Sequence, residues 1–85
     1  MKEIMKNRTK KFALDCWILC SKLPKSREFN AYVSQLIRCS SSVGANYRAS
    51  VRAKSPADFL YKIEIVLEEA DETLFWLVFP VPIPV

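Results

Sequence analysis

Residues 35–52 read QLIRCSSSVGANYRASVR, a stretch that places three consecutive serines, an asparagine and the chain's only glycine within a helical pattern. Serine and asparagine side chains compete for backbone hydrogen bonds, and glycine loses the most conformational freedom, so all three are poor helix formers. Small side chains, however, let the backbone of a neighbouring helix approach closely. The stretch therefore predicts a helix that other helices contact on more than one side.

This central helix is predicted to cover residues 27–53, because Ser26 is placed to cap its first turn and no proline occurs before Pro56. Gly44 and Ser40 would face a first neighbouring helix. The opposite side carries small residues that would admit a second neighbour: Ala31, Ser34, Ser42, Ala45 and Ala49. The main apolar stripe recurs at the 3.6-residue period and consists of Phe29, Val33, Leu36, Val43, Tyr47 and Val51.

Two further helices are predicted, one on each side of the central helix in the sequence. The first covers about residues 4–22 and ends before Pro24, with an apolar stripe of Met5, Phe12, Cys16, Leu19 and Leu23. The other covers about residues 56–78, where Ser55 is a capping residue and Pro56 suits the first helical position. Its predicted buried side consists of Phe59, Ile63, Val66, Ala70, Leu74 and Leu77.

Residues 1–78 are therefore predicted to form one all-α, antiparallel helical-bundle domain, followed by a proline-rich tail at 79–85. Prolines at 80, 82 and 84 favour an extended, polyproline-like conformation. The apolar run that leads into the tail is too short and too interrupted by proline to span a bilayer. We therefore expect no contact with a membrane.

The composition disfavours catalysis. The chain contains no histidine, which excludes Ser-His-Asp and Cys-His catalytic arrangements. Its three cysteines, Cys16, Cys20 and Cys39, are too few for a metal site without histidine and are interpreted as small core residues. We expect a non-enzymatic protein with no cofactor and no bound metal, in the reducing cytoplasm.

Charge is distributed unevenly along the chain. Residues 1–54 carry twelve basic and three acidic side chains, a net charge of +9, whereas residues 55–85 have a net charge of −5. A basic surface of this kind indicates either a phosphate-binding face or pairing with the acidic third helix. The candidate nucleic-acid-binding residues are Lys6, Arg8, Lys10, Lys11, Arg38, Arg48, Arg52 and Lys54.

For Arg38 and Arg48 the pairing alternative, with Glu64, Glu68 and Glu69, is favoured, whereas the N-terminal lysines have no evident acidic partner. The acidic run at 68–72 is interpreted as a solvated or arginine-paired face, because its carboxylates do not converge. Gln35 and Asn46 are expected to join a polar network between helices.

The third helix has a second apolar side, and three helices cannot cover every apolar face. Trp17, Tyr61 and Trp76 are more typical of a core or subunit interface than of base stacking. The predicted helix-packing or oligomer interface consists of Ser42, Gly44, Ala45, Asn46, Ala49, Tyr61, Ile65, Phe75 and Trp76.

Several motifs together resemble the four helix bundle protein family, which includes proteins encoded within intervening sequences of bacterial 23S ribosomal RNA genes. These motifs are the Leu23-Pro24 turn, QLIR followed by small residues, Asn46-Tyr47, SPADFLYKI and EEADETLFWL. The resemblance covers about residues 8–77 and implies an up-and-down four-helix bundle, commonly assembled as a homopentamer, with no securely known enzyme among its members.

The chain departs from the family pattern at two places. Many relatives carry an acidic residue where this chain has Ala49, and the proline tail follows Leu77 where the family has a fourth helix.

Taken together, the residues and the resemblance predict a self-associating protein that binds RNA or DNA electrostatically through its basic half. The alternative is a protein–protein interaction module or oligomeric scaffold with no nucleic-acid binding.

Overall fold

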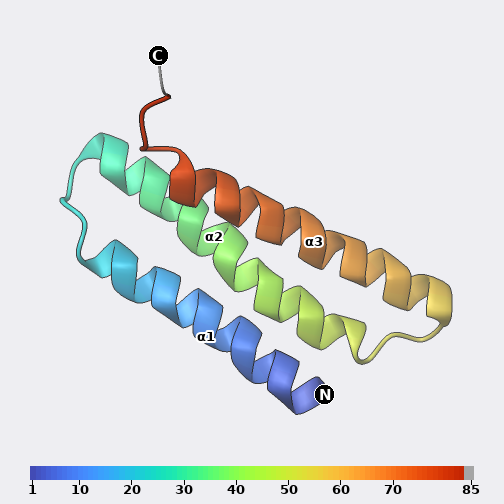
Figure 1. Cartoon of the computed structure of the whole chain (residues 1–85). Coiled ribbons are helices and arrows are strands. Elements are labelled where there is room, and N and C mark those ends of the chain that lie inside the picture. Colours follow the sequence, from blue (N-terminus) through green and yellow to red (C-terminus); the bar gives the residue numbers. More distant parts are fainter. Residues whose placement is uncertain (84–85) are drawn as a thin grey trace.

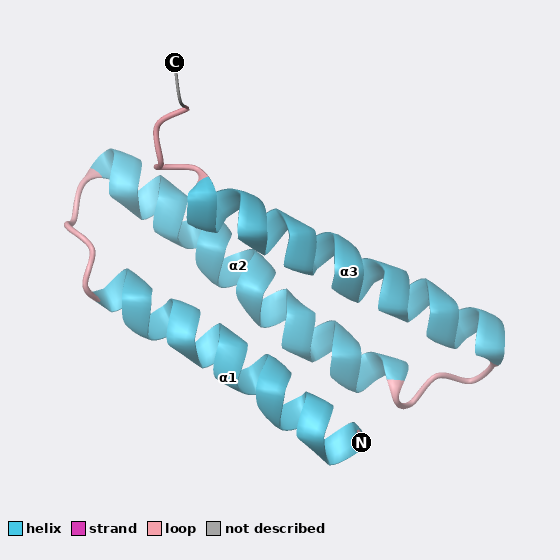
Figure 2. Cartoon of the chain, viewed as in Figure 1, coloured by secondary structure: helices cyan, strands magenta, loops and turns pink. Residues whose placement is uncertain are grey.

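The computed structural model describes residues 1–83 and contains three antiparallel helices joined by short loops (Figures 1 and 2). They are α1 (Lys2–Ser21), α2 (Arg27–Ser50) and α3 (Pro56–Val78). The predicted all-α class is therefore confirmed. None of the three described helices is both long and apolar enough to cross a membrane.

Local capping interactions fix the starts of α2 and α3. The Ser26 side chain accepts a hydrogen bond from the backbone N–H of Phe29 at 3.1 Å, and the Ser55 side chain accepts one from Asp58 at 3.0 Å. Helix α2 ends three residues before the predicted position, at Ser50. A turn follows the helix there, in which the Ala53 N–H donates to the Ser50 carbonyl at 3.1 Å.

The described part of the proline-rich tail, residues 79–83, begins with a turn in which the Val81 N–H donates to the Val78 carbonyl at 3.0 Å. Residues 84–85 of the predicted extended tail lie outside the described part.

Helix α2 lies in the middle of the molecule and packs against both other helices (Figure 1). Among the described residues, no Cα atom of α1 lies within 8 Å of one in α3. The apolar core centres on Cys16, Cys20 and Leu36. Half-buried side chains from all three helices surround this centre: Phe12, Tyr32, Val33, Ile37, Trp76 and Leu77.

Helix α1 passes close to α2 at Gly44. A Cβ atom at Gly44 would lie 3.5 Å from both the backbone oxygen and the hydroxyl oxygen of Thr9. Thr9 is buried there, and its hydroxyl donates to the Met5 carbonyl at 2.9 Å. The small residue in the opening stretch therefore sits where the two helices meet.

Several residues predicted to be buried are instead exposed. Leu19, Phe59 and Leu74 are 43, 42 and 59% exposed, although each belongs to the main apolar stripe of its helix. On α3 it is Thr73 that is fully buried against α2, with its hydroxyl donating to the Glu69 carbonyl at 2.7 Å. The prediction for α3 was wrong because its apolar surface is wider than the contact with α2.

Candidate nucleic-acid interface

A groove of about 280 Å³ runs between α1 and α2 and combines a basic rim with a floor of small residues. Lys6 and Lys10 contribute from α1, one helical turn apart, and Arg48 contributes from α2. The remaining lining residues are uncharged: Thr9, Ala13, Ser41, Gly44 and Ala45. Three positive charges from two helices therefore surround a recess without a carboxylate in its lining.

The recess continues along the seam between α1 and α2. A second hollow shares Lys10, Ala13 and Ser41 with the first and adds Trp17 and Ile37. A third shares Trp17 and Ile37 and ends at Lys25. We call the three hollows together the outer groove. The Trp17 side chain is 60% exposed, so an aromatic ring lies within a channel that has basic residues at both ends.

Ser40 and Ser41 of the opening stretch line this groove without leaving their hydroxyl groups unpaired. The Ser41 hydroxyl donates to the Ile37 carbonyl at 2.7 Å, and the buried Ser40 hydroxyl donates to the same carbonyl at 3.3 Å. Such bonds to the preceding helical turn satisfy the hydroxyl within its own helix. Short side chains thus keep the groove open.

The groove cations differ in how far their charge is already neutralised. Lys6 lies 3.6 Å from Glu3 in the same helix, and the Glu3 side chain is 81% exposed. An exposed pair of this kind contributes little and exchanges readily with another anion. Among the described residues, neither Lys10 nor Arg48 takes part in an ion pair, so the pairing expected for Arg48 with the acidic third helix is corrected.

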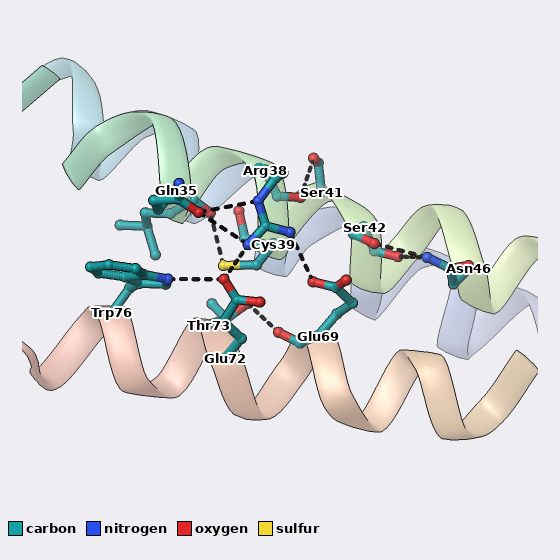
Figure 3. Close-up of polar contacts among 12 residues, drawn as sticks. Gln35, Arg38, Cys39, Ser41, Ser42, Asn46, Glu69, Glu72, Thr73 and Trp76 are labelled. Atoms are coloured by element: carbon teal, nitrogen blue, oxygen red, sulfur yellow. Dashed lines mark hydrogen bonds and ion pairs between the residues drawn. The ribbon is translucent and has the colours of Figure 1, made fainter. Parts of the chain in front are cut away.

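Arg38 belongs to a different arrangement, on the side of α2 that faces α3 (Figure 3). Its guanidinium pairs with Glu69 at 3.4 Å and also with Glu72. It also donates two hydrogen bonds of 3.2 Å to the Gln35 side chain. Glu72 accepts a further hydrogen bond from the Trp76 indole at 3.1 Å. The charge of Arg38 is therefore used in joining α2 to α3.

The other basic candidates do not converge on the groove. Lys11 pairs with Asp15 at 2.8 Å, so the expectation that the N-terminal lysines lack acidic partners was wrong for both Lys6 and Lys11. Arg8, Arg52 and Lys54 are exposed and take part in no side-chain ion pair within the described residues.

A local ion pair sits near the start of α3. The Asp58 carboxylate accepts hydrogen bonds from the Lys62 side chain at 2.7 Å and from the Lys54 backbone N–H at 3.1 Å. The hydrogen bond from Lys62, and to a smaller extent the one from the Lys54 N–H, holds the pKa of Asp58 below its ordinary value.

The predicted polar network is only partly inter-helical. Gln35 reaches α3 through Arg38, whereas the Asn46 side chain donates to the Ser42 carbonyl and hydroxyl at 2.9 and 2.8 Å within α2 (Figure 3). The expectation for Asn46 is corrected accordingly, since its partners lie on its own helix.

The other predicted interface residues fall in several environments. Ala45 lines the outer groove, and Ala49 is half-buried. Tyr61 and Phe75 are 62 and 53% exposed, whereas Ile65 and Trp76 are half-buried. The Trp76 ring packs against the core, so the second apolar side of α3 is divided between the interior and the surface.

The three cysteines are free and buried, and burial raises the pKa of both Cys16 and Cys20. Within the described residues, no group of three or more cysteine or acidic side chains is placed to hold a metal ion.

The sequence matches the family described as 23S rRNA-intervening sequence protein over residues 2–81. The chain belongs to this family. Among curated proteins, none matches the chain.

The fold of this 23S rRNA-intervening sequence protein family member is also found in a solved structure. The chain is similar to a protein of unknown function from the S23 ribosomal protein family of Bacteroides thetaiotaomicron VPI-5482, with 34% identity and a TM-score of 0.81. The match covers 94% of this chain and 74% of that chain. Neither the family description nor the description of that structure indicates an enzymatic activity.

Proposed function

We propose that this family member is a non-enzymatic, self-associating, cytoplasmic helical protein that binds RNA or DNA through its outer groove. The observation that carries the proposal is the convergence of Lys6, Lys10 and Arg48 around a recess floored by small residues. The three free, buried cysteines support a reducing compartment, and the absence of histidine from the sequence supports a non-catalytic role.

Binding would be electrostatic. Lysine and arginine side chains neutralise backbone phosphates and release condensed counterions, which makes the affinity strongly dependent on salt. The small side chains of the floor let the sugar-phosphate backbone approach α1 and α2 closely. Trp17 offers a ring on which a base of a single strand could stack, a contact that tolerates any sequence. We therefore expect a preference for single strands and little sequence specificity.

Self-association would strengthen this binding. A single groove with three phosphate contacts has low affinity, but two or more grooves held in one assembly engage the same strand with a raised effective concentration. Exposed apolar side chains on α1 and α3, among them Leu19 and Leu67, supply surface for such an assembly.

The test is the binding of a fluorescently labelled 20-nucleotide single-stranded RNA, and of DNA of the same sequence, measured by anisotropy across a salt series. Replacing Lys6, Lys10 and Arg48 together with glutamine should weaken binding and make the slope of log affinity against log salt shallower by about two. The matched control replaces Lys2, Lys22 and Arg27, which removes the same charge outside the outer groove. Equal losses in both variants would contradict the assignment of the groove.

A second candidate function is a protein–protein interaction module, and the exposed apolar residues of α3 favour it. Leu60, Leu67 and Leu74 are 61, 63 and 59% exposed at seven-residue spacing. In that case a protein partner covers this ridge and the basic residues only maintain solubility. Unchanged mass of the protein in the presence of RNA at low salt would favour this second function.

A further inference from the structure

We propose that two copies of this chain pack with their inner faces together, so that the basic α1 of one copy lies over the acidic α3 of the other. The inner face is the side of the three helices away from the outer groove. It is defined by Phe12, Leu19, Phe29, Tyr47, Phe59 and Leu74. The inference rests on the self-association proposed above and adds the surface and the orientation.

Helix geometry and the hollows of the structure place these residues on one side. Lys10 and Trp17 of α1 line the outer groove. At 100° per residue, Phe12 and Leu19 lie on the other side of the buried stripe of α1. A hollow of about 700 Å³ brings Tyr47 and Phe59 together with the start of α1. The inner face therefore draws on all three helices.

The apolar pattern of α3 extends this face to its edge. Leu60, Leu67 and Leu74 repeat every seven residues, and Ile63, Ala70 and Leu77 follow each of them by three. This is the spacing of apolar residues that seats one helix against another along its whole length. Leu60, Leu67 and Leu74 are more than half exposed, so this half of the apolar pattern of α3 is not covered by another element of the described chain.

The exposed area is sufficient for a dimer. The chain exposes 6503 Å², whereas a folded monomer of 9.8 kDa exposes roughly 5,200 Å². The difference of about 1,300 Å², to which the exposed tail after Val78 also contributes, is of the same order as the roughly 800 Å² that each partner buries in a standard stable interface. Pairing of the inner faces would bring the exposed surface of each copy close to that of an ordinary globular chain.

Charge selects one of the two ways in which the faces can meet. Helices α1 and α3 both run antiparallel to α2 and begin at the same end of the molecule (Figure 1). A two-fold axis along α2 sets α1 over the partner's α3, which brings Arg8 and Lys11 near the partner's Glu64 and Asp71. An axis across the helices would set α1 on α1 and α3 on α3, with like charges opposed.

The heights of these charges along the helices also agree. Arg8 is six residues into α1 and Glu64 is eight residues into α3, so both lie within the first three helical turns. Glu64, Glu68 and Asp71 are exposed, and none has an ion-pair partner among the described residues. They remain available for a second copy.

The surface is tested by sedimentation velocity of the full chain without nucleic acid. We expect twice the 9.8 kDa monomer mass. Leu67→Glu should yield a monomer that keeps its helical circular dichroism, whereas the matched control Leu14→Glu, on the outer-groove side of α1, should stay dimeric. A wild-type monomer, or an assembly of any size that survives Leu67→Glu, would overturn the proposal.

The orientation is tested by charge reversal. Arg8→Glu with Lys11→Glu should weaken the dimer about tenfold, and Glu64→Lys with Asp71→Lys should do the same. Combining all four substitutions should restore the association, because the pairs are re-formed with opposite sign. A combined variant weaker than either pair would overturn the orientation. RNA binding by a monomeric Leu67→Glu variant would show that the outer groove functions even if the dimer proposal fails.

Discussion

At the scale of single residues, the contact between Gly44 and Thr9 determines how closely α1 approaches α2. An added Cβ at Gly44 would lie 3.5 Å from two oxygens of Thr9, which is an ordinary contact distance. One extra carbon therefore fits, whereas a longer side chain would meet the backbone of α1. The preference at this position is for small size, since the residue lies in regular helix and no described residue has a positive φ.

Gly44→Ala should therefore raise the free energy of unfolding by about 0.5–1 kcal/mol, because alanine loses less conformational freedom in a helix than glycine does. Gly44→Leu should lower it by about 1–3 kcal/mol, because the added atoms force the helices apart. Urea denaturation followed by circular dichroism measures both changes. Equal destabilisation by alanine and leucine would show that the helices meet more tightly than the structure indicates.

Asp58 should make stability dependent on pH in the acid range. Its pKa is lower in the folded chain than the ordinary value of 3.8, because Lys62 and the Lys54 N–H donate to its carboxylate. The unfolded chain therefore binds the proton more readily than the folded chain does. The contribution of Asp58 to the free energy of unfolding is complete above the unfolded pKa and is lost as pH falls through the folded pKa.

Asp58→Asn should accordingly reduce the fall in urea midpoint between about pH 6 and pH 2.5. Glu28→Gln serves as the control, because the Glu28 side chain is 74% exposed and its ion-pair partner Arg27 is 94% exposed, so this pair contributes little to stability. An identical pH dependence in the wild type and Asp58→Asn would exclude this role for Asp58.

At the scale of helices, the two seams of α2 have different chemistry. The contact with α1 has small residues where it borders the outer groove and leaves this groove open, whereas the contact with α3 includes a polar cluster around Arg38 (Figure 3). The Arg38 side chain is 48% exposed, so its ion pairs link α2 to α3 but contribute only modestly to stability.

This difference predicts opposite behaviour for two arginines on the same helix. Arg38→Gln should lower the free energy of unfolding by about 0.5–1 kcal/mol and leave RNA affinity nearly unchanged. Arg48→Gln should weaken RNA binding and leave stability nearly unchanged, since Arg48 lines the groove and has no ion pair in the described chain. Urea denaturation measures the stability of the two variants, and anisotropy titration measures their affinity for RNA. Equal effects of the two substitutions on RNA binding would contradict the placement of the groove.

The helices themselves could be predicted from the sequence because their signals are local. Ser26, Ser55 and Pro56 define helix starts through groups only a few residues away. The rotation of α3 could not be predicted, since periodicity identifies an apolar stripe without showing whether another element covers it. Leu74 was therefore expected in the core, and the fully buried Thr73 was missed because threonine hydropathy does not indicate burial.

The candidate site was predictable only in part. Lys6, Lys10 and Arg48 were among eight basic candidates, and only the packing of α1 on α2 shows that these three share a recess. Conversely, the partner of Arg38 depends on helix rotation. Glu69 was expected, but Glu72 was not.

At the scale of the whole molecule, we propose that two surfaces serve two tasks. In the proposed dimer the apolar inner face would join the two copies, while the basic outer groove would face away from that contact. An assembly built in this way displays its grooves on opposite sides, where a strand or several strands can reach more than one of them. Affinity then comes from the number of grooves rather than from specific base contacts.

The most direct measurement is the mass of the protein in solution by light scattering, alone and with single-stranded RNA, at about 50 mM and about 500 mM salt. We predict a discrete multimer that gains the mass of bound RNA at low salt and loses it at high salt. A multimer whose mass is unaffected by RNA at either salt concentration would contradict this prediction.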